Sequence, residues 1–308
     1  MDKRMKSEIG KLGIIGLGRI GIPVARAFLK SGYTVFGYDS RNEAVKEFTA
    51  MGGLRLSSPS EVAHHCQTVI ILVLNDIQVL EVFSGYNGLF EGTDKKCSTI
   101  ICMSTINRSN LESIAKQCEE KNIGFVDCPF TGGPSRVPSG ELTLIAAASQ
   151  EQIKKVTPLL DVIGKVVHVG DTPGIGQAVK HCNQLFVGVV HGATMEVITL
   201  ARKMNLDTAL VSKIIGSGIA GNDYFKLLSD SVINSVPSPG GLGQMCKDVS
   251  IVSKTLDEVH LPAPIFRAAA AYFQRAENLG MQEKEGADLI GVVESMSEKE
   301  DVGQHKKK

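Results

Sequence analysis

The chain has 308 residues, of which 43% are hydrophobic, and its 33 Lys and Arg balance 33 Asp and Glu to a formal net charge of zero. A chain of this length is about two domains long and can bury a core without disulfide bonds. Its ordinary hydrophobic content excludes disorder as the main state, and its balanced charge argues against a nucleic-acid partner.

The seven cysteines include no CxxC pair, so they predict neither a metal site nor a disulfide framework. Cysteines beside apolar segments behave as small hydrophobic residues and indicate a reducing compartment. The N-terminus is polar and lacks the apolar core of a signal peptide, and no stretch approaches the ~20 apolar residues of a membrane span. We therefore expect a soluble, cytoplasmic protein without a membrane partner.

The first 170 residues alternate short apolar runs with helical patterns. Continuous apolar runs are typical of strands that are buried on both faces of a parallel sheet. Their alternation with helices predicts right-handed crossovers and an α/β, Rossmann-type doubly wound sheet. Strands are expected at 11–16, 33–38, 69–74, 98–103, 123–127, 142–148 and 165–169, and helices at 19–31, 41–51, 60–66, 77–83, 107–121 and 150–163.

The pattern changes at the turn-rich segment DTPGIG, after which only helical periodicity is found. Helices are expected at 176–204, 207–217, 223–229, 242–259, 264–279 and 286–295. We therefore predict a dinucleotide-binding Rossmann domain at 1–173 and an all-helical substrate and oligomerisation domain at 174–308. Because the helix at 176–204 is too apolar to stand free in water, a homodimer or homotetramer is expected.

A glycine-rich turn, Gly16-Leu17-Gly18-Arg19-Ile20-Gly21, fits GxGxxG between the first expected strand and the first expected helix. Such glycines allow a tight turn, the approach of a pyrophosphate to the backbone, and close helix–strand packing. The helix dipole would stabilise the diphosphate. The candidate cofactor contacts in this turn are Gly16, Gly18, Arg19, Ile20 and Gly21.

An acidic residue, Asp39, follows the second expected strand, 23 positions after Gly16. A carboxylate there can accept hydrogen bonds from the ribose hydroxyls of NAD and repels the 2′-phosphate of NADP. Arg41 could instead pair with that phosphate, so NADP stays an alternative, and Ser40 between them is a further candidate contact. The competing interpretation is a glycine turn that binds nothing, with Asp39 capping a helix.

Three later loops follow strand ends, where open α/β sheets bind their ligands. Asn75 is expected near the ribose side of the cofactor, and Thr105 near the nicotinamide end. Capping of the helix at 107–121 explains Thr105 equally well. The third loop includes Thr131, Gly132 and Gly133, whose backbone N–H groups could hold a carboxylate. By itself, this third pattern also fits a simple β-turn.

Lys180, Asn183 and Gln184 share one face of the helix expected at 176–204, because they are spaced i, i+3 and i+4. A polar patch on an otherwise apolar helix needs partners or a function, and a lysine withdrawn from water can exchange protons. His191, on nearly the same stripe, is interpreted as a core histidine. Lys247-Asp248 is a second candidate pair, and a solvated charge pair on a helix surface explains it equally well.

Four sequence blocks together resemble the β-hydroxyacid dehydrogenases, typified by 3-hydroxyisobutyrate dehydrogenase and related to 6-phosphogluconate dehydrogenase. The resemblance covers about 11–295, and the blocks occur in the family's order: IIGLGRIG, DCPFTGGPSRVPSGELTL, GIGQAVKHCNQ and CKD. Each block is loose alone, but their combination in this order is highly specific.

The resemblance implies Lys180 as the catalytic acid and base, and Asn183 as a residue that orients the substrate. It implies that Thr131, Gly132 and Gly133 hold the substrate carboxylate. Lys247 would close over the nicotinamide and the substrate, and Asp248 would position its helix.

The chain departs from the family pattern at Ile20 for Met, Thr131 for Ser and Gln184 for Asn. Arg136 and Pro138 stand in a segment that is usually small and Ala-rich, and Arg136 is either a contact for a second anionic group or an exposed loop residue. These differences leave the identity of the substrate open.

The function predicted from the sequence is hydride transfer between NAD, or alternatively NADP, and a small β-hydroxy acid or its semialdehyde. The alternatives are an imine reductase-type enzyme and a non-catalytic NAD(P)-binding module. Relatives that reduce imines typically carry Asp or Tyr at the position of Lys180, which argues against the first. Intact Lys180 and Asn183, with no added basic segment, argue against the second.

Overall fold

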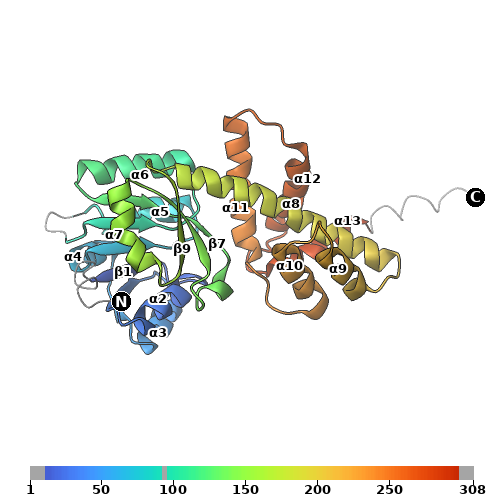
Figure 1. The fold of residues 1–308 in the computed structure, drawn as a ribbon, viewed down its shortest axis with the longest axis horizontal. Coiled ribbons are helices and arrows are strands. Elements are labelled where there is room, and N and C mark those ends of the chain that lie inside the picture. Colours follow the sequence, from blue (N-terminus) through green and yellow to red (C-terminus); the bar gives the residue numbers. More distant parts are fainter. Residues whose placement is uncertain (1–10, 92–95, 298–308) are drawn as a thin grey trace, which may run out of the picture. The chain divides into compact units, whose positions relative to one another are not determined.

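The computed structural model describes residues 11–91 and 96–297 as helices, strands and connecting loops (Figure 1). The chain forms two compact units, which divide after Lys180. The first unit is a sheet covered by helices, and the second unit is helical.

The sheet of the first unit has the strand order β3-β2-β1-β4-β5-β6-β8-β7, and β9 pairs with β8. Neighbouring strands from β3 to β6 run parallel. The order reverses between β1 and β4, which is the switch point at which doubly wound sheets bind ligands. The strands are β1 (Leu12–Ile15), β2 (Val35–Tyr38), β3 (Leu54–Arg55), β4 (Thr68–Ile71), β5 (Thr99–Cys102), β6 (Gly124–Asp127), β7 (Phe130–Thr131), β8 (Leu142–Ala147) and β9 (Gly164–Gly170).

Apolar cores lie on both faces of this sheet. Successive residues of a strand contribute to different cores: Ile14 belongs to one cluster and Ile15 to the other, and Ile70 and Ile71 divide in the same way. This explains the continuous apolar runs, because a strand with two buried faces has no solvent-facing positions. The covering helices are α2 (Gly21–Lys30), α3 (Asn42–Ala50), α4 (Pro59–His65), α5 (Asp76–Ser84), α6 (Arg108–Glu120) and α7 (Gln150–Leu160).

A third apolar core, which includes Met195, Leu242, Phe266 and Phe273, fills the second unit. Its helices are α8 (Ile175–Lys203), α9 (Thr208–Ser217), α10 (Asp223–Asn234), α11 (Leu242–Glu258), α12 (Pro264–Asn278) and α13 (Leu289–Ser297), with a 3₁₀ turn, η2 (Gly286–Asp288), before α13. All helices and long strands expected from the sequence are confirmed, with ends that shift by a few residues.

The second half of the sheet differs from the expected parallel arrangement. β8 pairs antiparallel with β6 and with β7, and β9 runs parallel to β8. The loop after β6 contains β7 and the 3₁₀ turn η1 (Pro134–Arg136) and returns the chain in the opposite direction. No α-helix separates β6 from β8, and a parallel neighbour needs a longer crossover connection, usually through such a helix.

One described helix, α8, is long and apolar enough to cross a membrane by length and composition. The sequence prediction that no stretch approaches this size is therefore wrong for α8. Half of its most apolar window is buried inside the structure. The core helix of a soluble protein has the same character, so this finding is weak evidence for a membrane.

Candidate active site

The GxGxxG turn lies at the carboxyl end of β1, and its three glycines face different surroundings. A Cβ on Gly16 would lie 2.5 Å from the carbonyl oxygen of Leu72, and a Cβ on Gly21 would lie 1.9 Å from that of Gly16. Packing therefore requires both of these glycines. A Cβ on Gly18 would meet only the tip of Arg41, at 3.5 Å, so the space above Gly18 is open to a ligand.

Helix α2 begins directly after this turn without a side chain that caps it. Ile20 occupies the cap position, its side chain forms no capping hydrogen bond, and the first turn contains no acidic residue. The positive end of the helix is therefore left for an anionic group, as in other dinucleotide sites.

Asp39 follows β2 and is held against the glycine turn. Its carboxylate accepts hydrogen bonds from the backbone N–H of Leu17 at 2.8 Å and of Arg41 at 2.9 Å. The Arg41 guanidinium binds both carboxylate oxygens, also at 2.9 Å. Burial alone would raise the pKa of Asp39, but the hydrogen bonds from Arg41 and Leu17 outweigh it and lower the pKa. Asp39 is thus an ionised acceptor at the expected ribose position, and Ser40 beside it is exposed.

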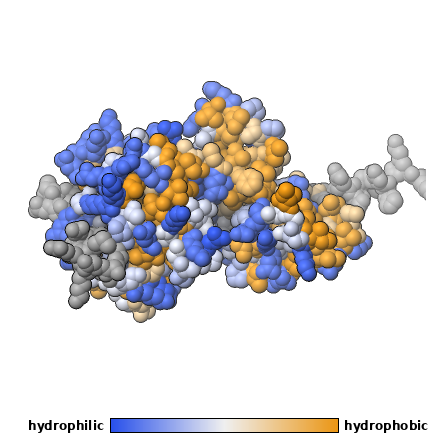
Figure 2. Space-filling view, in the orientation of Figure 1, coloured by the Kyte–Doolittle hydropathy of each residue, from blue (hydrophilic) through white to orange (hydrophobic). Residues whose placement is uncertain are grey.

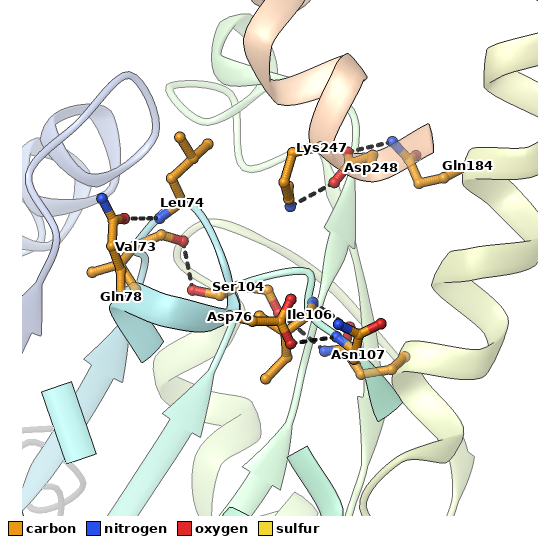
Figure 3. A network of polar contacts seen from close by, with 11 residues as sticks. Val73, Leu74, Asp76, Gln78, Ser104, Ile106, Asn107, Gln184, Lys247 and Asp248 are labelled. Atoms are coloured by element: carbon orange, nitrogen blue, oxygen red, sulfur yellow. Dashed lines mark hydrogen bonds and ion pairs between the residues drawn. The ribbon is translucent and has the colours of Figure 1, made fainter. Parts of the chain in front are cut away.

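Asn75 and Thr105 occupy the loops after β4 and β5. The side chain of Asn75 accepts a hydrogen bond from the Gln78 N–H at 3.0 Å and so caps α5. Helix α6 begins at Arg108 with Asn107 at its cap position, so Thr105 lies two residues before that position. Figure 3 shows the contacts that hold these loops, including Asp76 with the Asn107 N–H and Ser104 with the Val73 carbonyl.

A buried carboxylate, Asp127, ends β6 and holds the first turn of α8. One oxygen accepts hydrogen bonds from the N–H groups of Gly174 at 2.8 Å and Gln177 at 3.1 Å. The other oxygen accepts from the Gln177 side-chain amide at 3.1 Å. That amide also donates to the Ser104 carbonyl and accepts from the Ile106 N–H, each at 3.0 Å. Three segments that are distant in sequence are thereby joined beside Thr105.

Thr131, Gly132 and Gly133 form a turn after β6, and all three are half-buried. Thr131 pairs with Thr143 of β8. Both glycines have positive φ, at 126° and 74°, a conformation that side chains disfavour. The stem of Arg136 lies against this turn, since its Cδ would be 3.2 Å from a Cβ on Gly132. The turn can therefore present backbone N–H groups, with a cationic residue next to it.

Lys180 and Asn183 lie one turn apart on α8, and Lys180 is only 6% exposed. A buried lysine amine can release and accept protons, and Lys180 lies near the N-terminal end of α8. Asn183 is half-buried.

Gln184, the third residue of the expected polar face, has a structural partner. Its side-chain amide donates to Asp248 at 2.6 Å, and Lys247 forms an ion pair with the other Asp248 oxygen at 2.5 Å (Figure 3). Asp248 is 1% exposed, so the interpretation of Lys247-Asp248 as a solvated surface pair is wrong.

His191 is a core residue, as expected. It lies 3.0 Å from the Gly286 carbonyl and 2.9 Å from the Tyr224 hydroxyl, so both ring nitrogens are bonded. Burial lowers the pKa of His191 to about 4, so the ring stays neutral.

Two residues of this region were not singled out from the sequence. They are Asp127 and Gln177, which lie inside two of the blocks that resemble the family. The available signal was the start of α8 itself, which has no acidic residue in its first turn and therefore needs an acceptor from elsewhere in the chain.

The sheet order, the uncapped turn above Gly18 and the carboxylate at Asp39 together define a dinucleotide-binding α/β protein. Residues 11–170 match the model of the NAD-binding domain of 6-phosphogluconate dehydrogenase. Residues 174–293 match the NAD-binding model of NADP-dependent 3-hydroxyisobutyrate dehydrogenase.

Relatives match nearly the whole chain. The 2-(hydroxymethyl)glutarate dehydrogenase of Eubacterium barkeri is 30% identical over 93% of this chain and 96% of its own length. The mitochondrial 3-hydroxyisobutyrate dehydrogenase of Mus musculus is 30% identical over 94% of this chain and 88% of its own. A 3-hydroxyisobutyrate dehydrogenase structure from Salmonella typhimurium has a TM-score of 0.82 at 26% identity and covers 92% of this chain and 99% of its own.

The chain therefore belongs to the β-hydroxyacid dehydrogenase family, and the resemblance seen in its sequence is confirmed. It is an oxidoreductase that uses NAD(P) and acts on CH–OH groups.

Proposed function

We propose that this protein transfers a hydride reversibly between NAD(P) and the hydroxyl-bearing carbon of a small β-hydroxy acid, or the matching semialdehyde. The observation that carries the proposal is the buried Lys180, one turn beyond the anchored start of α8, in the same compact unit as the open glycine turn. The relatives named above act on hydroxy acids of this kind.

The residues of the glycine turn fit the cofactor. Gly18 leaves room for the pyrophosphate, which the N–H groups at Arg19, Ile20 and the start of α2 would hold together with the helix dipole. Asp39 is suited to accept from the ribose hydroxyls, with Ser40, Arg41, Asn75 and Thr105 as further contacts. Bound NAD(P) supplies the hydride acceptor or donor.

In this proposal, the turn of Thr131, Gly132 and Gly133 binds the substrate carboxylate, and Asn183 orients the same molecule. Lys180 removes the hydroxyl proton during oxidation and returns it during reduction. The binding groups contribute to the rate by holding the reacting atoms in position. For Lys247, the proposal of a cofactor contact rests on the family resemblance.

NAD is proposed as the preferred cofactor because the ionised Asp39 repels a 2′-phosphate. The proposal also includes a functional boundary between the domains at 173/174. It further includes a cytoplasmic location and assembly as a homodimer or homotetramer. Support for self-association comes from α9, an apolar helix with no buried residue.

The proposal is tested by turnover with NAD and NADP on a panel of three- and four-carbon hydroxy acids and a cyclic imine. Hydride transfer to or from hydroxy acids or semialdehydes is expected. Turnover of the imine alone would indicate an imine reductase. Cofactor binding without any turnover would indicate a non-catalytic module, and either result would contradict the proposal.

A further inference from the structure

The start of α8 is joined to the sheet by one carboxylate rather than by a capping residue of its own. Asp127 accepts the N–H groups of Gly174 and Gln177, which flank the first turn. Gly176 lies so close that a Cβ there would be 2.8 Å from the carboxylate. The position of the first turn of α8 on the sheet, and with it that of Lys180 one turn later, depends on this contact.

The same carboxylate also controls the loop after β5, through Gln177. The Gln177 side chain is fully buried, and its amide contacts Asp127, the Ser104 carbonyl and the Ile106 N–H. The two loop contacts lie on either side of Thr105. Because every donor and acceptor has a defined partner, the amide has one orientation only.

We infer that Asp127, acting through Gln177, is a positioning residue of this dehydrogenase, which fixes Lys180 and the Thr105 loop in one rigid frame. This inference rests on the proposed function, in which Lys180 exchanges the proton and Thr105 lies near the nicotinamide.

The cost of burying Asp127 supports this role. Burial raises its pKa from 3.8 to about 6, although hydrogen bonds from Gly174, Gln177 and Gly176 act to lower it. The raised pKa stabilises the fold below pH 3.8, and this contribution is lost as the pH rises through about 6. At neutral pH the chain therefore keeps an ionised group that costs stability.

Protonation would disturb the frame, because it turns one of the two acceptor oxygens into an O–H donor, and both oxygens face N–H donors. The other titratable side chains facing Asp127 are the thiols of Cys102 and Cys128, whose pKa values burial raises so far that both stay neutral. Along α8 the nearest charged side chain is that of Lys180.

The test compares wild type with Asp127→Asn and Gly176→Ala. Asparagine keeps the size of the side chain but offers one acceptor oxygen instead of two. Alanine favours helix formation over glycine, so Gly176→Ala lowers activity only if contact with Asp127 matters. Matched controls are Asp161→Asn, at an exposed position of the same unit, and Gly291→Ala, where a Cβ meets no atom within 4 Å.

We expect both variants to lose about 10²-fold in kcat, the usual effect of a small misplacement of reacting groups. The Kd for NAD(P)H should change far less, because Thr105 is one of several proposed cofactor contacts and the glycine turn is untouched. The kcat of the wild type should fall as the pH drops through about 6. The kcat of Asp127→Asn should show no such fall, because asparagine does not titrate. Both control variants should match wild type.

A kcat within about threefold of wild type in Asp127→Asn would overturn the inference. Parallel losses of kcat, cofactor affinity and melting temperature would overturn it as well, because they indicate a structural role only. If Asp127→Asn does not fold, Gln177→Met, which leaves the backbone N–H contacts of Asp127 in place, must show the same selective loss of kcat. An inactive wild type would instead count against the proposed function.

Discussion

The pairing of Asp39 with Arg41 bears on whether the 2′-phosphate of NADP is repelled or bound. Asp39, the proposed ribose contact, carries a negative charge and holds the Arg41 guanidinium with both carboxylate oxygens. Hydrogen bonds to charged groups contribute about 1.5–3 kcal/mol, a factor of roughly 10–100 in an equilibrium.

We expect kcat/KM to favour NAD over NADP in the wild type. Asp39→Ala should lower the ratio of the two kcat/KM values by a factor of roughly 10–100, because Arg41 is then released to bind the 2′-phosphate. Arg26→Ala, which alters an exposed ion pair with Glu47, serves as the control and should leave the ratio unchanged. Equal or better use of NADP by the wild type contradicts this assignment.

Arg136 adds a cation beside the turn that is proposed to hold the substrate carboxylate. Because a guanidinium binds a carboxylate through paired, charge-assisted hydrogen bonds, we expect Arg136 to favour substrates with a second carboxylate. Arg136→Leu should lower kcat/KM for dicarboxylic hydroxy acids at least tenfold, about 1.4 kcal/mol, and change that for monocarboxylic ones far less. Equal losses for both classes would mean that Arg136 only shapes the loop. Arg55→Ala, at an exposed residue of the same unit, is the control.

Some of these residues could be predicted from the sequence because their signals are local. The glycine turn, Asp39 and Lys180 stand at fixed distances from recognisable strand or helix ends. The clamp of Asp127 and Gln177 joins residues 50 positions apart, and its contacts with Ser104 and Ile106 span more than 70. A spacing rule cannot detect such partners.

At the scale of elements, periodicity located the helices and long strands but not the direction of β8. Strand direction depends on how the preceding loop folds, and the loop after β6 contains β7 and a 3₁₀ turn rather than a crossover helix. The two-residue strands β3 and β7 are too short to show a period at all.

Helix α8 also contains a pH-sensitive contact in the second unit. Burial lowers the pKa of His191 from 6.5 to about 4. The neutral ring therefore stabilises the fold above pH 6.5, and this contribution is lost as the pH falls toward 4.

Protonation of His191 should therefore lower the free energy of unfolding of the wild type by roughly 1 kcal/mol for each pH unit between 6.5 and about 4. His191→Gln keeps one donor for Gly286 and one acceptor for Tyr224. Its free energy of unfolding, measured by chemical denaturation, should therefore fall less between neutral and acidic pH than that of the wild type. The control is His260→Gln, at an exposed position. Identical pH dependence in wild type and His191→Gln would show that the ring does not govern acid stability.

The whole molecule exposes many large apolar side chains on its helical unit. Figure 2 shows orange surface over this unit. The exposed large apolar side chains of the helical unit include Phe186 at 61% exposure, Leu210 at 54%, Ile214 at 61% and Ile265 at 73%. Contiguous exposed apolar surface is typical of protein interfaces.

We therefore expect a homodimer or larger assembly in sedimentation experiments at micromolar concentration. The double variant Leu210→Asp and Ile214→Asp should shift the protein toward monomer, because it places charges on the apolar face of α9. Lys154→Asp, on the first unit, should not have this effect. A monomeric wild type would refute the prediction.

In the proposed mechanism Lys180 exchanges the substrate proton, and the kcat of Lys180→Ala tests this role when the affinity for NAD(P)H is measured alongside. Loss of an acid–base group lowers rates by ~10²–10⁴-fold, so we expect such a loss in kcat with unchanged cofactor affinity. Lys180→Arg should fail equally, because a guanidinium does not release its proton near neutral pH. Lys203→Ala, at an exposed position in the last turn of the same helix, should behave like wild type. If Lys180→Ala keeps more than about a tenth of the wild-type kcat, a loss below ~1.4 kcal/mol, Lys180 is not the catalytic residue.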